Sequence, residues 1–189
     1  SEMCIRDSQL TVQGVRDSER RHPAPAIAPS SPTAAAFLEA LPFAPTAAQE
    51  RVAIELAEDM AQTQPMLRLV QGDVGSGKTL VAARAALDTI AAGYQVAFMA
   101  PTELLAEQHF TTLDAWLTPL NQSVAWLSGR TKGRARQQVL QALASGEAPL
   151  VVGTHALFQD DVHFHRLGLI IVDEQHRFGV HQRLSLADK

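Results

Sequence analysis

Residues 72–79 read Gly72-Asp73-Val74-Gly75-Ser76-Gly77-Lys78-Thr79, an ungapped match to G-x-x-x-x-G-K-[ST]. An apolar run over 66–70 precedes the motif, and an Ala-rich helical pattern begins at Leu80. A strand would therefore lead into a glycine-rich turn, and the turn would open a helix whose N-terminal amides point at phosphate. Glycine lets the backbone approach the phosphates because it has no Cβ. A plain Gly/Ser turn with an unrelated lysine is the alternative, but the flanking pattern favours a phosphate-binding loop.

The motif assigns a role to its last two residues. Lys78 would reach the β- and γ-phosphates of a nucleotide, and Thr79 would place its hydroxyl on Mg²⁺. We therefore expect a nucleoside triphosphate with a divalent ion as the ligand of this loop.

Composition restricts the class of protein. The chain has 189 residues, of which 46% are hydrophobic and 19% charged, as in globular domains. Its net charge of -4 argues against a broadly basic nucleic-acid surface, so any such contact must be local. Cys4 is the single cysteine, which excludes an internal disulfide and a cysteine zinc site. No apolar run approaches the roughly 20 residues that span a bilayer, and no signal peptide is visible, so we expect a cytoplasmic protein.

Two regions differ in composition. Residues 1–36 are predicted to form a tail and a Pro-rich linker, since four prolines fall within 23–32. The first eight residues join no apolar period and are left out of the fold argument, although a short helix over 9–21 is possible. Residues 37–189 are predicted to form the globular domain.

Strand and helix patterns alternate along this domain. Apolar runs predict strands over 66–70, 95–100, 123–127, 149–153 and 168–172. Helical patterns are expected over 47–60, 78–92, 102–117, 132–145 and, briefly, 154–158. Thr46 and Thr102 are predicted N-caps, and Gly93 is a predicted C-terminal glycine. The alternation predicts an α/β fold of the P-loop NTPase (RecA-like) type, a three-layer sandwich around a mostly parallel sheet, with 169–172 as a central strand.

A pair of acids follows that last apolar run. Asp173 and Glu174 would lie at the carboxyl end of the strand, where open α/β sheets bind ligands. Asp173 would hold Mg²⁺, and Glu174 would orient and polarise the attacking water. Two solvated acids at a strand end are the alternative, which the phosphate-binding loop makes less favourable.

Four motifs in order resemble those of superfamily two helicases. The segment 173–176 resembles the DExH box, residues 100–109 resemble motif Ia, and residues 151–156 resemble motif Ib. Phe43 and Gln49 resemble the aromatic residue and glutamine of a Q-motif, which reads adenine. The residues of the 72–79 loop and of 173–183 resemble those of the RecG family of bacterial ATP-dependent DNA helicases. The resemblance covers about 37–189.

This resemblance implies cofactors, partners and activity. ATP and Mg²⁺ would be the cofactors, and branched DNA held through its backbone phosphates would be the substrate. The activity would be remodelling in repair and recombination, including fork reversal and branch migration of Holliday junctions. A second RecA-like lobe and a wedge domain of the same polypeptide would be partners, and neither they nor motif III are found in this sequence. The isolated chain is therefore expected to bind nucleotide weakly and hydrolyse it very slowly.

The resemblance also implies a nucleic-acid contact. In such motors motifs Ia and Ib touch the DNA backbone, which points to Thr102, Gly153 and Thr154. Apart from the resemblance, residues 129–136 carry four positive charges in a loop leading into a helix, and each would neutralise one phosphate; they are Arg130, Lys132, Arg134 and Arg136. A good helix start, a good strand exit and a solvated loop are the respective alternatives.

Residues after the paired acids have implied roles as well. His176 is expected to sense nucleotide across the cleft between the lobes, or simply to satisfy a backbone carbonyl. Arg177 and Arg183 would contact across the same cleft or form surface ion pairs. A transcription-repair coupling translocase and a non-catalytic nucleotide-dependent binding module are the alternative functions.

Overall fold

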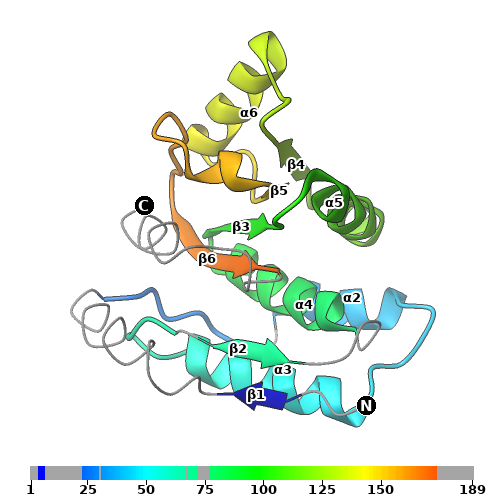
Figure 1. The fold of residues 1–189 in the computed structure, drawn as a ribbon. Coiled ribbons are helices and arrows are strands. Elements are labelled where there is room, and N and C mark those ends of the chain that lie inside the picture. The colour runs from blue at the N-terminus through cyan, green and yellow to red at the C-terminus, as the bar shows by residue number, and fades with distance from the viewer. Residues whose placement is uncertain (1–3, 7–22, 30, 67, 72–76, 174–189) are drawn as a thin grey trace. The chain divides into compact units, whose positions relative to one another are not determined.

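The computed structural model describes residues 4–6, 23–29, 31–66, 68–71 and 77–173. The chain divides into two compact units, Ser1–Ala92 and Gly93–Lys189, and each is described by itself (Figure 1). Among the described residues, no helix is long and apolar enough to cross a membrane.

Three helices make up most of the described part of the first unit. They are α2 (Pro32–Ala40), α3 (Ala47–Met60) and α4 (Lys78–Ala91). Both α2 and α3 contact α4, and apolar residues at helical spacing on α3 pack against Val81 of α4. Thr46 caps α3 as predicted: its Oγ1 accepts from the Gln49 amide at 3.2 Å, while Gln49 Oε1 accepts from the Thr46 amide at 2.9 Å. This reciprocal cap determines where α3 starts.

The Pro-rich segment lies against this helical unit. Residues 23–29 form neither helix nor strand, yet the Ile27 side chain is buried and its amide donates to Met60 O at 2.9 Å. Helix α2 follows, which the sequence analysis did not anticipate because it treated Pro32 as part of the linker. Proline is favourable in the first helical turn, where its missing N–H has no partner to lose. The predicted boundary between residues 36 and 37 lies inside this helix and stays a prediction.

The second unit contains a parallel sheet. Its strands are β3 (Gln95–Met99), β4 (Val124–Leu127), β5 (Leu150–Gly153) and β6 (Leu167–Val172), in the order β4-β5-β3-β6. All three strand pairs are parallel. Helices α5 (Glu103–Leu117) and α6 (Gly133–Ser145) connect them, with short 3₁₀ turns at Thr118–Leu120 and His155–Phe158. The predicted alternation and its parallel sheet are confirmed to within about two residues at each end.

Both faces of this sheet are covered. Successive side chains of a strand point to opposite faces. On one face, Phe98 and Trp126 contact α5 through ring pairs with His109 and Phe110. On the other face, Met99 and Leu127 share a buried cluster with residues of α6. The two helices therefore lie on opposite sides of the strands, as the sequence pattern predicts (Figure 1).

Two strand predictions were wrong in their placement. Strand β2 (Leu69–Gln71), which precedes the glycine-rich loop, pairs antiparallel with β1 (Cys4–Arg6) in a separate two-stranded sheet. A three-residue strand such as β1 is too short to show a hydrophobic period, so it was not predicted from the sequence. In the four-stranded sheet β6 is the end strand rather than a central one, and its six residues are all partly exposed.

Gln95 joins three segments of the second unit. Its side chain is buried; Nε2 donates to Leu143 O at 3.0 Å and to Ala148 O at 2.8 Å, and Oε1 accepts from the Arg166 amide at 3.0 Å. One amide thus ties the end of α6, the approach to β5 and the approach to β6 to the start of β3.

We expect Gln95→Leu to destabilise this unit by about 3 kcal/mol, because it keeps the volume but removes the side-chain partner of Ala148 O and of the Arg166 amide, while Leu143 O keeps its bonds from the Gly146 and His165 amides. The denaturant midpoint should fall, and amide exchange should rise at the starts of β3 and β6. Gln138→Leu, at an exposed position of α6, is the control and should have little effect. Equal stability of the two variants would show that the network is not needed.

Candidate nucleotide-binding site

Gly77 ends the glycine-rich loop and begins helix α4. It has φ +79°, in the left-handed region that glycine adopts without strain. A Cβ placed on it would lie 2.0 Å from Nε2 of Gln49. Backbone conformation and space therefore both favour glycine at this position. Residues 72–76, which complete the predicted loop, lie outside the described residues.

Lys78 and Thr79 are the first two residues of α4. Their half-buried side chains leave from the end of the helix that carries partial positive charge. The N-cap residue, Gly77, has no side chain that could bond to the helix amides, and the first turn contains no acidic residue. The first amides of α4 thus have no side-chain acceptor from the cap, the arrangement in which helix N-termini bind phosphate.

Gln49 lies against the loop rather than in an open pocket. It is 9% exposed, its Oε1 caps α3, and its Nε2 faces Gly77. Phe43, its predicted partner in reading adenine, is 49% exposed. The structure therefore brings Gln49 to the end of the glycine-rich loop and leaves Phe43 at the surface.

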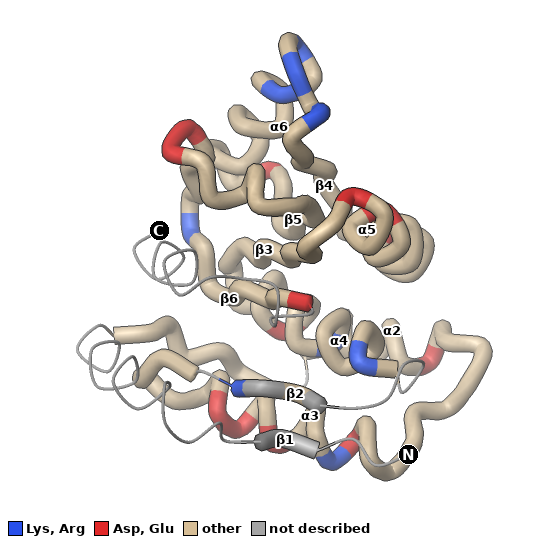
Figure 2. The backbone as a smooth tube through the Cα atoms, in the orientation of Figure 1, with Lys and Arg blue, Asp and Glu red and all other residues tan. Residues whose placement is uncertain are grey.

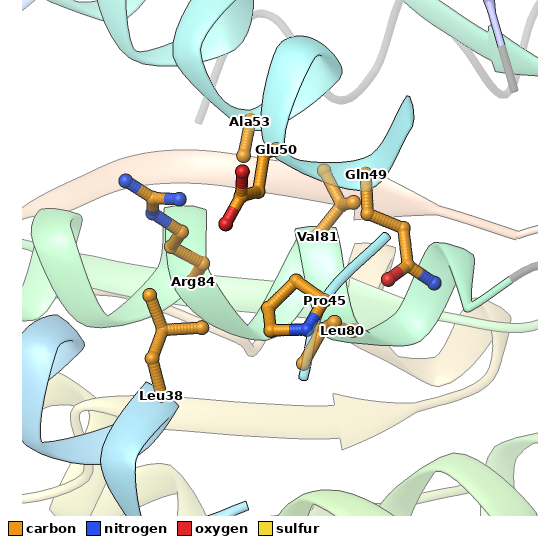
Figure 3. A pocket seen from close by; sticks show the side chains of 8 residues that line it. All are labelled: Leu38, Pro45, Gln49, Glu50, Ala53, Leu80, Val81 and Arg84. Carbon is orange, nitrogen blue, oxygen red and sulfur yellow. The ribbon is translucent and has the colours of Figure 1, made fainter. Parts of the chain in front are cut away.

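A small hollow lies beside Gln49 (Figure 3). Side chains of α2, α3 and α4 and of the loop before α3 line it, among them Leu38, Pro45 and Arg84. Its volume of about 10 Å³ has room for about one water molecule. It is far smaller than a cavity that holds a nucleotide base.

Asp173 stands directly after β6. Its amide donates to Met99 O at 2.8 Å, which extends the pairing of β6 with β3 by one residue. Its carboxylate Oδ2 lies 2.7 Å from Nε2 of His109 on α5. The strand and this imidazole together hold the carboxylate at the carboxyl end of the sheet, where the sequence predicted it.

The predicted metal ligands fit a hard divalent ion. Thr79 would offer a hydroxyl oxygen and Asp173 a carboxylate oxygen, the donors that Mg²⁺ prefers. Within the described ranges no cluster of three or more His, Cys, Asp or Glu could hold a metal by itself. In proteins Mg²⁺ ordinarily takes one or two carboxylate ligands and completes its shell with water and substrate phosphates. Glu174, His176, Arg177 and Arg183 lie outside the described residues.

The residues predicted to contact DNA differ in their accessibility. Thr102 is the N-cap of α5, and its Oγ1 accepts from the Leu105 amide at 3.3 Å. Thr154 is buried, and its Oγ1 has no hydrogen-bond partner in the described part of the chain. A hydroxyl so enclosed does not face a DNA backbone in this structure. Gly153 packs against β4, since a Cβ there would lie 1.9 Å from Leu127 O.

Basic residues are concentrated along the first half of α6 and the loop before it, where the tube is blue (Figure 2). Arg130 is 86% exposed and pairs with Glu103, in the first turn of α5, at 2.8 Å. Arg136 makes a two-pronged contact with Asp161, so its charge is already used inside the unit. Lys132 is the exposed N-cap residue of α6. Arg136 therefore has a structural role, and the other three basic side chains of 129–136 are accessible.

His109 lies in the segment that resembles motif Ia, yet no role for it was predicted from the sequence. One signal was available: His109 follows Ala106 and precedes Leu113 and Leu117 on the buried stripe of α5. A histidine on a buried helical face needs a partner for its ring nitrogens. The identity of that partner, Asp173, depends on the fold.

Comparison with known proteins places the chain in a family. The family model described as DEAD/DEAH box helicase matches residues 46–188. The chain belongs to the DEAD/DEAH box helicase family.

Within this helicase family, the similarity to RecG is confirmed. The chain is 61% identical over 153 residues to the ATP-dependent DNA helicase RecG of Escherichia coli, an alignment that covers 81% of this chain and 22% of that protein. The structure of RecG bound to a three-way DNA junction matches with a TM-score of 0.83 and 44% identity, over 90% of this chain and 24% of that one. The alternative of a transcription-repair coupling translocase is not favoured by these matches.

A second solved helicase shares the fold alone. The UvsW helicase of bacteriophage T4 matches with a TM-score of 0.59 at 17% identity, over 82% of this chain and 54% of that one. The RecA-like motor-lobe fold predicted from the sequence is thereby confirmed. The chain spans about a fifth to a quarter of the length of the RecG proteins it matches.

Proposed function

We propose that this chain is the nucleotide-binding motor lobe of a RecG-type, ATP-dependent DNA helicase that remodels branched DNA. The main support is the start of α4: a left-handed Gly77 places Lys78 and Thr79 in the first turn of a helix, in a chain similar to RecG over most of its length. Remodelling of forks and Holliday junctions in repair and recombination is the activity that this similarity suggests for the whole protein.

The chemistry is a phosphoryl transfer from ATP to water. Amides of the 72–79 loop and Lys78 would bind and orient the phosphates, and Thr79 and Asp173 would hold Mg²⁺. When bound, Mg²⁺ neutralises charge on the phosphate oxygens. Glu174 orients the attacking water, and His176 relays the state of the nucleotide to the rest of the motor.

Adenine would be recognised by the segment before α3 and by the first turn of that helix. Exposed Phe43 is available to stack on a base, whereas the side-chain oxygen of Gln49 is already used by the α3 cap. We assign Phe43 to direct contact, and Gln49 to contact with adenine through its amide group while it supports the end of the loop at Gly77.

DNA contact is proposed along the start of α5 and the basic loop. Thr102, the backbone of Gly153, and the side chains of Arg130 and Lys132 would meet backbone phosphates, whereas the buried Thr154 already donates its amide to Leu127 O. Such contacts do not depend on sequence and weaken as salt rises, because binding releases counterions. They suit an enzyme that recognises the shape of a junction.

Further parts of the same polypeptide complete this proposal. A second RecA-like lobe would close over ATP and supply an arginine to the γ-phosphate, and a wedge domain would engage the junction. Residues 37–189 would form the motor lobe, with 1–36 as its connection to the wedge, and the enzyme would act in the cytoplasm.

The test is ATP hydrolysis by the complete protein with forked DNA, linear duplex or no DNA. Forked DNA should stimulate turnover most, and stimulation should fall between 50 and 200 mM salt, the range over which phosphate contacts weaken. The isolated 189-residue chain should turn over very slowly, because an arginine supplied by the second lobe is worth about 10³-fold or more in rate.

Two results would contradict the proposal. An equal rate of ATP hydrolysis with forked DNA and with linear duplex would contradict branched DNA as the substrate. Robust DNA-stimulated turnover by the isolated chain would show that a second lobe is not needed.

A further inference from the structure

The imidazole of His109 is held from two sides in the second unit. Its Nε2 lies 2.7 Å from Asp173 Oδ2, and its ring centroid lies 4.6 Å from that of Phe98 with the planes inclined by 42°. The side chains of His109 and Asp173 are only 17% and 23% exposed. A ring packed against β3 and bonded at the end of β6 has little freedom to rotate.

The helix that carries His109 is itself well anchored. Thr102 caps its start, and Ala106, Leu113 and Leu117 are buried on the same stripe as His109. Phe110 makes an edge contact with Trp126 of β4 at 5.6 Å between ring centroids. The position of the imidazole is therefore set by the packing of α5 on the sheet, before any ligand arrives.

We propose that His109 is a positioning residue for the metal-holding carboxylate of Asp173. The Nε2–H group donates to one carboxylate oxygen, in the neutral ring as in the charged one, and so restricts rotation of the carboxylate about its terminal bond. Groups that orient a metal ligand in this way typically change metal affinity or activity by about 10–100-fold when they are removed. This inference rests on the proposed function, because it takes Asp173 as a ligand of Mg²⁺.

Two substitutions separate the hydrogen bond from the packing. His109→Gln keeps an N–H donor the same number of bonds from Cα as Nε2, whereas His109→Leu keeps bulk and removes the donor. His163→Gln is the matched control, since His163 is exposed in the same unit and outside the proposed site.

The experiment measures binding of a fluorescent, non-hydrolysable ATP analogue to the complete protein, with Mg²⁺ titrated from zero and with EDTA. His109→Leu should raise the half-saturating Mg²⁺ concentration by about 10–100-fold and leave the affinity in EDTA unchanged. His109→Gln should restore most of the Mg²⁺ response, and His163→Gln should match wild type. If His109→Leu does not fold, His109→Asn, whose amide is one bond shorter, replaces it in the comparison with His109→Gln.

The outcomes distinguish this inference from the function on which it rests. A His109→Leu protein with a wild-type Mg²⁺ response would overturn the positioning role and leave the proposed function intact. An equal loss of affinity in EDTA and in Mg²⁺ would also overturn it, because it would reveal a general packing defect. A wild-type protein that bound no nucleotide at all would contradict both the proposed function and this inference.

Discussion

Lys78→Ala should abolish ATP hydrolysis by the complete protein, with kcat lowered on the order of 10²–10³ or more. The lysine stands in the first turn of α4, where its ammonium group adds a full charge to the partial charge of the helix end. That charge interacts most strongly with the γ-phosphate as negative charge shifts during transfer, so kcat should fall more than nucleotide affinity. Steady-state hydrolysis with forked DNA, together with direct nucleotide binding, measures both effects.

Two further variants make this result specific. Glu174→Gln should keep nucleotide binding and lose hydrolysis, because it removes the water-orienting acid and leaves the phosphate contacts. Arg68→Ala removes a basic side chain of the same unit that pairs with Asp59 at the surface, and should change stability by about 1 kcal/mol at most with activity unchanged. An active Lys78→Ala enzyme would remove the basis for this site assignment.

Gly153→Ala should destabilise the parallel sheet by about 3 kcal/mol or more. The added Cβ would lie 1.9 Å from Leu127 O and 2.9 Å from Leu127 C, both backbone atoms of the neighbouring strand. Backbone atoms cannot turn aside as a side chain can, so β4 and β5 must separate and lose ladder hydrogen bonds. Thermal unfolding and amide exchange in β4 and β5 of the complete protein are the measurements.

Gly129→Ala is the control for this substitution. A Cβ on Gly129 meets nothing within 4 Å, so stability should be unchanged or slightly higher. A loss of DNA binding by Gly153→Ala with intact exchange protection would instead favour the direct phosphate contact proposed for this residue. Equal stability of both glycine variants would refute the close-packing argument.

Most elements of the fold could be predicted because their signals are local. Thr46 and Thr102 cap the starts of α3 and α5, and Gly93 follows the end of α4 with φ +83°. Each of these residues lies within one turn of the helix end that it marks. Strands β3 to β6 are short apolar runs between helical periods, which is a pattern visible in neighbouring residues. Helix α2 was missed because the prolines before it outweighed its single favourable feature, proline in the first turn.

The candidate site was predictable in its parts and not in its contacts. Short motifs predict Lys78, Thr79 and Asp173 as site residues, since phosphate and Mg²⁺ chemistry requires those groups at those spacings. Burial of the Thr154 hydroxyl and the pairing of Arg136 with Asp161 followed no local rule. Both depend on how the turn after β5 packs, which involves segments distant in sequence.

By itself the amino-acid sequence determined the order of helices and strands, the parallel sheet and the candidate phosphate-binding residues, because caps, periods and ligand motifs act over a few neighbouring residues. Only the tertiary structure decided that Gln49 lies against Gly77, that Gln95 joins three segments, and that His109 meets Asp173. Those contacts join residues tens of positions apart. Their free energy comes from close packing and from pairing buried polar groups, which no periodicity along the chain records.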